Sequence, residues 1–162
     1  MMKITEFVTK DRILLSRAIT SKKRVLELLS ESVATALPGF TAAGIFDCFV
    51  TRERLGSTGL GHGVAIPHSR SENVSRPVAA FLKLQEGVDY DAVDREPVDL
   101  LCALLVPEKS TDEHLQILAM LAEMFSDQGL CAQLRAATSS TQIYSLLANW
   151  VPALSQAAST HR

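Results

Sequence analysis

Residues 98–106 constrain the fold more than any other part of the sequence, because they are almost continuously apolar. The run is far too short to cross a bilayer as a helix, which takes about 20 residues. A short apolar run of this kind is typical of a β-strand that is covered on both faces. We therefore expect a sheet with packed layers on both sides.

The rest of the chain supplies elements that can form those layers. Shorter β-rich runs predict strands at 12–15, 64–66 and 78–84. Apolar residues at helical spacing predict helices over 22–36, 41–54 and from 110 onward, with two shorter helices at 129–136 and 141–150. Because helices lie between and after the strands, we expect one α/β domain with helices on both faces of a central sheet.

Capping residues mark the starts of three of these helices. Ser21 and Thr41 precede the first two, where a hydroxyl can accept a hydrogen bond from the first helical turn. Ser110 and Glu113 have the spacing of a capping box, in which each side chain bonds to the backbone of the other residue.

The composition excludes several classes of protein. A length of 162 residues suits one domain, and a net charge of -2 disfavours general binding to nucleic acid or to anionic lipid. The first residues have no apolar signal-peptide core, so we expect a cytoplasmic protein that is not embedded in a membrane. Cys48, Cys102 and Cys131 are widely spaced in apolar stretches, which predicts buried reduced thiols.

A glycine-rich segment, Gly56 to Gly63, holds four of the chain's eight glycines. It could be a tight connection between a helix and a strand, or it could let the backbone approach an anion closely. The hydroxyls of Ser57 and Thr58 could then add donors beside Gly59, so these three residues are predicted phosphate ligands. The segment lacks the Gly-Lys-Ser/Thr of a Walker A loop, and it leads into a strand rather than into the helix of a Rossmann fingerprint.

His68 follows a predicted strand and Pro67. Proline ends strand pairing, so the next side chain is expected in a stiff turn at the end of a strand. A lone histidine at such a place is more often an ordinary surface residue. Whether His68 has a function therefore depends on the residues near it. A neutral imidazole is a good nucleophile for a phosphoryl group, and the product carries about two negative charges.

Neighbouring cations and a second histidine fit that chemistry. Arg52, Arg54 and Arg70 are candidates to neutralise a phosphoryl group, although each could be a solvated surface residue. His114 is expected in the first turn of a helix, where the dipole favours a neutral ring and welcomes anions. It could instead be a partly exposed residue without a role.

A zinc site is the main alternative chemistry. His62, His68 and His114 could converge on one metal ion, but they lack the close spacing common in zinc sites, and nearby arginines would repel a cation. We therefore expect no metal ion and no cofactor, and we assign no role to His62.

Two blocks of the sequence resemble a known family, the enzyme IIA proteins of the bacterial phosphotransferase system, mannitol/fructose type. The first block is 52–70, above all Gly56-Ser57-Thr58-Gly59 and Val64-Ala65-Ile66-Pro67-His68. The second joins 97–107 to His114-Leu115-Gln116-Ile117-Leu118. With Asp94 and Arg95, the chain is most similar to the nitrogen-regulatory branch of the family. The similarity covers about residues 3 to 150.

The resemblance implies a mixed sheet flanked by helices, in a domain at 1–150. The last residues are small and polar, so we expect a flexible tail at 151–162. The resemblance also implies that His68 accepts a phosphoryl group from a histidine phosphocarrier protein. Arg52 matches the family's phosphate-binding arginine, and His114 matches its auxiliary histidine.

Two roles follow from the resemblance and stay open at this point. A regulator of the nitrogen branch would control partners such as sensor kinases or potassium transporters through its phosphorylation state. A sugar-specific component would instead pass the phosphoryl group to the IIB domain of a fructose or mannitol permease.

Overall fold

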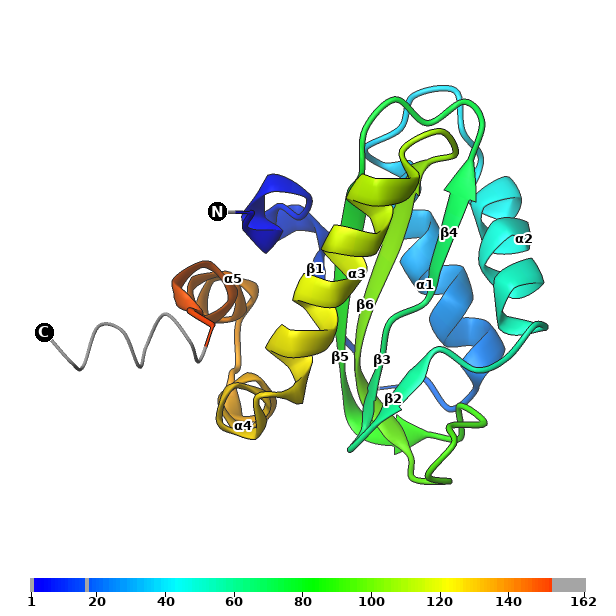
Figure 1. Cartoon of the computed structure of the whole chain (residues 1–162). Coiled ribbons are helices and arrows are strands. Elements are labelled where there is room, and N and C mark those ends of the chain that lie inside the picture. The colour runs from blue at the N-terminus through cyan, green and yellow to red at the C-terminus, as the bar shows by residue number, and fades with distance from the viewer. Residues whose placement is uncertain (1, 17, 153–162) are drawn as a thin grey trace, which may run out of the picture.

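The computed structural model describes residues 2–16 and 18–152, which form an α/β domain around a six-stranded sheet (Figure 1). The strands are β1 (Ile13–Ser16), β2 (Gly59–Gly61), β3 (Val64–Ala65), β4 (His68–Ser71), β5 (Val78–Val88) and β6 (Val98–Pro107). The helices are α1 (Lys22–Ala34), α2 (Ala42–Glu53), α3 (Thr111–Ser126), α4 (Gln128–Ala136) and α5 (Ser140–Asn149), after short 3-10 turns at Ile4–Glu6 and Lys10–Arg12. The predicted fold class, a single α/β domain with a central mixed sheet flanked by helices on both faces, is confirmed.

β6 lies at the centre of the sheet, whose strand order is β1-β5-β6-β3-β2, with β4 also paired to β6. β5 runs antiparallel to β6, whereas β3 and β4 run parallel to it, which makes the sheet mixed. β3 and β4 follow each other along one edge of β6, with Val64 beside Leu100 and His68 beside Leu104. Between them, the carbonyl of Pro67 accepts a hydrogen bond from the amide of Leu104 at 2.9 Å.

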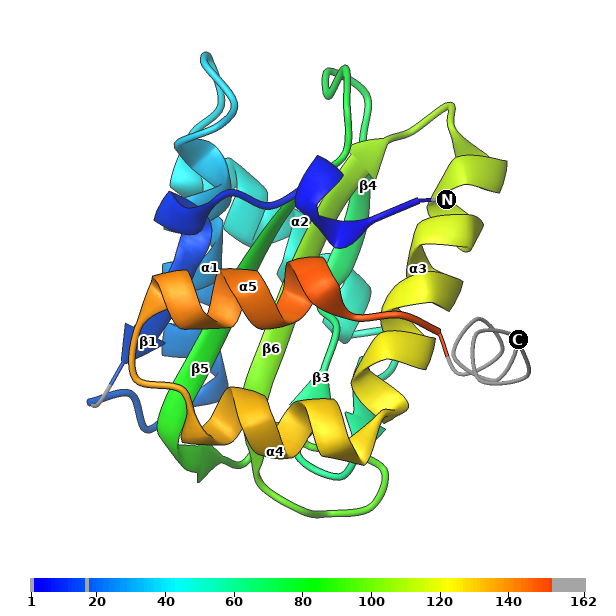
Figure 2. The same ribbon diagram turned by 90° about the vertical axis from the view of Figure 1, so that its left-hand side faces the viewer.

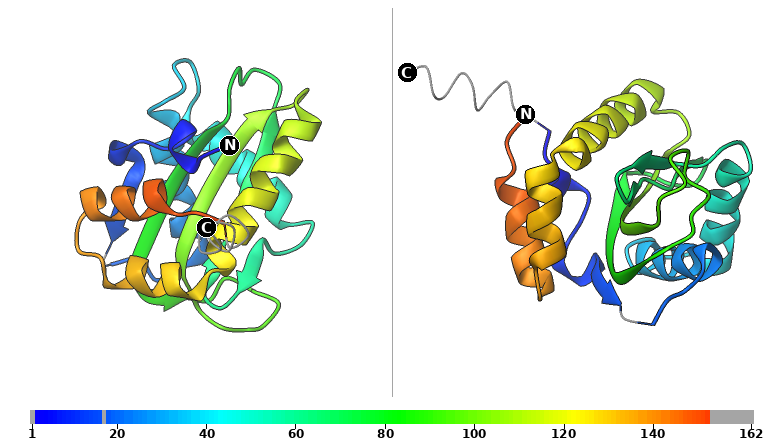
Figure 3. Two further views of the ribbon diagram at one scale, coloured as in Figure 1. Left: turned by 60° about the vertical axis from the view of Figure 1, so that its left-hand side comes forward. Right: turned by 90° about the horizontal axis from the view of Figure 1, so that it is seen from below.

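Both faces of β6 are buried, as its apolar run predicts. Leu100, Cys102 and Leu104 belong to the core shared with α3, α4 and α5, while Leu101 and Ala103 belong to the core shared with α1 and α2. The view from below in Figure 3 shows the sheet between these two helical layers, and Figure 2 shows α4 and α5 in front of the strands. Burying each large apolar side chain stabilises the fold by about 1.5–3 kcal/mol.

The position of β4 sets up the functional site. This strand lies between α2 and α3 (Figure 1). Side chains of residues paired across a sheet point to the same face. Because His68 pairs with Leu104, whose side chain lies in the α3 core, the His68 ring is on the α3 face of the sheet.

Two of the predicted helix caps are confirmed and one is wrong. The hydroxyl of Ser21 accepts a hydrogen bond from the amide of Arg24 (3.1 Å), and that of Thr41 accepts from Gly44 (3.0 Å). Ser110 precedes α3, but its side chain makes no capping hydrogen bond with the described residues. Its ψ of 56° departs from the extended backbone that aims a capping hydroxyl at the first turn.

The two strands β2 and β4 are absent from the sequence prediction. β4 has the polar sequence His-Ser-Arg-Ser, which has no apolar pattern, and it becomes a strand through its pairing with β6. The expectation that His68 lies in a turn beyond the last paired residue is therefore wrong. Pro67 does end β3, but His68 opens the next strand.

Two further expectations concern the membrane and the end of the chain. None of the helices that the structure describes is long and apolar enough to cross a membrane. Except for Val151 and Pro152, the predicted flexible tail lies outside the described residues, so it stays a prediction.

Candidate functional site

Three elements enclose an open hollow of about 630 Å³ that brings together the main candidate residues. Arg52 comes from the end of α2, His68 and Arg70 come from β4, and His114 comes from the first turn of α3. The rest of the lining is Asp47, Cys48, Thr51, Leu55, Ser69 and Glu108. We call this space the histidine hollow.

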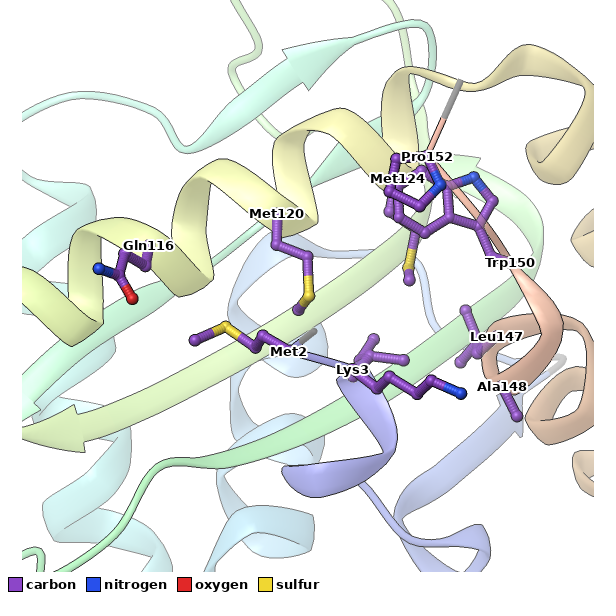
Figure 4. A pocket seen from close by; sticks show the side chains of 10 residues that line it. Met2, Lys3, Gln116, Met120, Met124, Leu147, Ala148, Trp150 and Pro152 are labelled. Carbon is purple, nitrogen blue, oxygen red and sulfur yellow. The ribbon is translucent and has the colours of Figure 1, made fainter. Parts of the chain in front are cut away.

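A second hollow, between α3, α5 and the N-terminal segment, differs in its chemistry. Figure 4 shows Met2, Met120, Met124 and Trp150 around it, with Lys3 as its charged side chain. Its lining offers neither a histidine nor a carboxylate. Of these two hollows, the histidine hollow has the groups suited to phosphoryl chemistry.

The ring of His68 is held in one tautomer. Its Nδ1 lies 2.7 Å from the backbone carbonyl of Ile66. A carbonyl can only accept, so Nδ1 carries the hydrogen, and in the neutral ring Nε2 keeps its lone pair. In this tautomer the lone pair of Nε2 is available for nucleophilic attack.

His114 provides an unmatched group beside this nucleophile. The two rings lie 5.6 Å apart between centroids and are tilted by 59°. His114 is 9% exposed, and its Nε2 has no hydrogen-bond partner among the described residues. Leaving a buried polar group unpaired costs about 1–3 kcal/mol, so a hydrogen bond from this atom to a group in the hollow would be favourable.

Both histidines are tuned toward the neutral form. Burial lowers the pKa of His68, and the charge of Arg52 lowers it further, while the bond to Ile66 and the charge of Glu53 act in the opposite direction. Burial also lowers the pKa of His114, helped by His68 and Arg70. The lowered pKa values favour two neutral rings at neutral pH, each with one nitrogen that carries a hydrogen and one that keeps a lone pair.

Two of the three candidate arginines line the hollow. The Nη1 of Arg52 donates to the carbonyl of Gly56 at 2.8 Å, and the Nη1 of Arg70 donates to the hydroxyl of Thr111 at 3.4 Å. A guanidinium has five N–H donors, so each keeps donors for an anion. Arg54 is exposed and is not part of the lining.

The predicted phosphate ligands Ser57, Thr58 and Gly59 lie outside the hollow's lining, and their polar groups already have partners. The amide of Gly59 donates to the hydroxyl of Ser57 at 3.1 Å. The buried hydroxyl of Thr58 bonds to Glu53 and lies 3.1 Å from the hydroxyl of Tyr90. These contacts hold the segment in place, so the structure gives no support to a direct contact with phosphate.

His62 and two of the three cysteines lie outside the histidine hollow. His62 lines a separate hollow with Phe125, so the three histidines of the zinc alternative do not converge. Among the residues described, no group of three or more His, Cys, Asp or Glu side chains could hold a metal ion. Cys102 and Cys131 are buried as predicted, but Cys48 is only half-buried and lines the histidine hollow.

Sequence reasoning missed three residues behind the hollow. Glu53, Lys22 and Tyr90 form a linked group of hydrogen bonds and ion pairs next to Arg52. Their sequence positions carry no local signal, since Tyr90 is 37 residues from Glu53. The one hint is that Glu53 directly follows the predicted phosphate-binding arginine.

The fold and this site together define a phosphoryl-transfer component. The family described as "Phosphoenolpyruvate-dependent sugar phosphotransferase system, EIIA 2" matches residues 6–150. The chain belongs to this family, which confirms the resemblance seen in the sequence.

Within the family, the chain is similar to nitrogen regulatory proteins. It is 44% identical over 147 residues to the nitrogen regulatory protein of Pseudomonas aeruginosa, covering 91% of this chain and 96% of that protein. It is 43% identical over 128 residues to that of Escherichia coli K12, covering 78% of each. The crystal structure of the nitrogen regulatory protein from Neisseria meningitidis has a TM-score of 0.80 and 39% identity, covering 89% of this chain and 98% of that one.

Proposed function

We propose that this protein is a cytoplasmic regulatory phosphocarrier that accepts a phosphoryl group on His68 from a histidine phosphocarrier protein. Its phosphorylation state would then control partner proteins such as sensor kinases or potassium transporters. The observation that carries the proposal is the unpaired Nε2 of His114 beside a nucleophile whose tautomer is fixed by Ile66.

The transfer exchanges one nitrogen–phosphorus bond for another. Nε2 of His68 attacks the phosphorus atom with its lone pair, and the bond from phosphorus to the donor's histidine breaks and returns its electron pair to that ring. Nδ1 keeps its hydrogen on the Ile66 carbonyl throughout. The chain therefore needs no base to activate the nucleophile at neutral pH.

The surrounding donors fit the charge that arrives with the phosphoryl group. Arg52 and Arg70 supply positive charge, and His114, in the tautomer with a hydrogen on Nε2, would donate to a phosphoryl oxygen. Catalysis of this kind consists mainly of positioning and charge stabilisation.

Exposed apolar side chains at and near the hollow offer contacts for a protein donor. Leu55 lines the hollow and is 83% exposed, and Leu115, which follows His114 in the sequence but is not part of the lining, is 60% exposed. Large apolar side chains exposed beside a reactive group are typical of a protein interaction site. They favour a protein rather than a small molecule as the source of the phosphoryl group.

Incubation with phosphoenolpyruvate, enzyme I and the phosphocarrier, followed by intact mass measurement, tests the carrier role. One phosphoryl group per chain is expected, and none would overturn the proposal. Growth of a deletion strain on fructose or mannitol separates the regulator from the sugar-specific component. The regulator predicts normal growth on both sugars.

A further inference from the structure

The carboxylate of Glu53 is buried behind the histidine hollow at the end of α2, with 6% of its side chain exposed. It accepts hydrogen bonds from the hydroxyl of Tyr90 at 2.9 Å and from the amide and hydroxyl of Thr58, the amide at 3.3 Å. The ammonium group of Lys22 lies 3.0 Å away. A buried carboxylate is costly unless its charge and its lone pairs are matched in this way.

These contacts fasten the short loop that follows α2. The side-chain carboxylate of Glu53 accepts a hydrogen bond from the amide of Thr58 in this loop. The backbone carbonyl of Glu53 accepts another from the amide of Gly56 at 3.1 Å. The carbonyl of Gly56 in turn accepts from the guanidinium of Arg52. The loop is therefore a continuous link from the buried carboxylate to the cation that lines the hollow.

The charges in this group explain why the carboxylate sits behind Arg52 and not in the hollow. A phosphoryl dianion would be repelled by a bare carboxylate, and Glu53 is not part of the hollow's lining. Lys22 neutralises it and lies 4.4 Å from the centroid of the Tyr90 ring, which completes the group. Arg52 therefore lines the hollow, while the carboxylate of Glu53 stays behind it.

We propose that Glu53 is a positioning residue for phosphoryl transfer, which acts by holding the loop that orients Arg52 toward His68. This inference rests on the proposed function and deepens it. Ser57 and Thr58, which the sequence suggested as phosphate ligands, belong on this view to the support of the site. A misplacement of about 1 Å at a transferring group can cost about a hundredfold in rate.

A double-mutant cycle tests the link. Rates of phosphoryl uptake from the phosphocarrier are compared for the parent protein, Glu53→Gln, Arg52→Ala and the double variant. We expect Glu53→Gln to slow uptake about 10- to 100-fold in the parent, and less than about twofold in the Arg52→Ala background. Tyr90→Phe, which removes one donor to the carboxylate, should show a smaller loss with the same dependence on Arg52.

Two further measurements separate positioning from general destabilisation. Glu31→Gln removes an exposed carboxylate paired with Arg24 on α1 and should leave the rate unchanged. The pKa of His68, followed by NMR, should fall in Glu53→Gln, because the carboxylate's charge raises it. Thermal unfolding checks that each variant is folded at the assay temperature.

Equal slowing by Glu53→Gln with and without Arg52 would overturn the positioning role, as would a parental rate in Glu53→Gln. Uptake by the parent protein with either of those results would leave the proposed function standing. No uptake by the parent protein would overturn the proposed function and the positioning role together.

Discussion

Arg52 and His68 of the histidine hollow flank the glycine-rich segment in the sequence, yet the fold uses the hollow and the segment differently. In the hollow, His114 keeps a buried nitrogen without a partner and Arg52 keeps free donors. In the glycine-rich segment, the hydroxyls of Ser57 and Thr58 are bonded to their own neighbours. The buried nitrogen of His114 is available to a ligand in the hollow, whereas the hydroxyls of Ser57 and Thr58 are already used within the chain.

The comparison has a direct consequence for mutagenesis. Variants in the hollow should change phosphoryl transfer and leave the fold intact, because the groups removed contact few others. Variants in the glycine-rich segment should change stability first. Each prediction below tests the role given either to the histidine hollow or to the glycine-rich segment.

His68→Ala should abolish phosphoryl uptake, since it removes the nucleophilic nitrogen. The side chain is half-buried at the rim of the hollow, so thermal unfolding should be close to that of the parent protein. His62→Asn is the matched control, because asparagine tolerates the left-handed backbone at this position (φ 56°). It should take up phosphate normally, whereas full labelling of His68→Ala would refute the assignment.

Arg52→Ala should slow transfer about 30- to 1000-fold, the cost of about 2–4 kcal/mol for losing a charged contact to the transferring group. Arg70→Ala should slow it much less, because Arg70 is exposed and its bond to Thr111 is long. Stopped reactions followed by mass measurement give both rates. Small and equal effects would reduce Arg52 to a surface charge.

His114→Ala should still accept phosphate, but transfer in at least one direction should be impaired. Its N–H stabilises the phosphoryl oxygens without forming a covalent bond, so the loss is partial. His114→Gln keeps an N–H donor and should recover part of the rate. Parental rates in both variants would leave the unpaired nitrogen without a function. No uptake by a folded Ala variant would suggest a relay nucleophile.

The pH dependence of stability should also originate in the hollow. Burial lowers the pKa of both His68 and His114, so below the ordinary histidine pKa of about 6.5 the unfolded chain binds more protons than the folded protein. The free energy of unfolding should therefore fall as the pH drops from about 7 to 5. In urea titrations, the double variant His68→Gln/His114→Gln should show a flatter profile. An unchanged slope would place the titrating groups elsewhere.

Ser57→Ala should have the smallest effect. It removes a hydroxyl that accepts from Gly59, at a cost of about 0.5–1.5 kcal/mol in stability. Phosphoryl uptake should stay within about twofold of the parent rate, since the hydroxyl does not line the hollow. A loss as large as that of Arg52→Ala would make Ser57 a phosphate ligand and break the contrast between the two regions.

The sequence was informative wherever one residue type decides the local structure. The apolar run of β6 predicts a strand buried on both faces, and Ser21 and Thr41 predict helix starts, all as observed. β4 could not be predicted, because its polar residues form a strand only through pairing with β6.

The candidate site also has residues that the sequence predicts and residues that it does not. Arg52, His68 and His114 were singled out from the sequence, and the fold brings all three to one hollow. The group around Glu53 and Tyr90 could not be predicted, because contacts between residues so far apart in the chain depend on how α2 and the β5–β6 connection pack.

The most direct test of the account is to map the phosphoryl group after incubation with phosphoenolpyruvate, enzyme I and the phosphocarrier. The account predicts one group per chain, labile in acid and stable in base, on the peptide that contains His68 and absent from His68→Ala. A group on Ser57, Thr58 or His114 in the parent protein, or full labelling of His68→Ala, would contradict it.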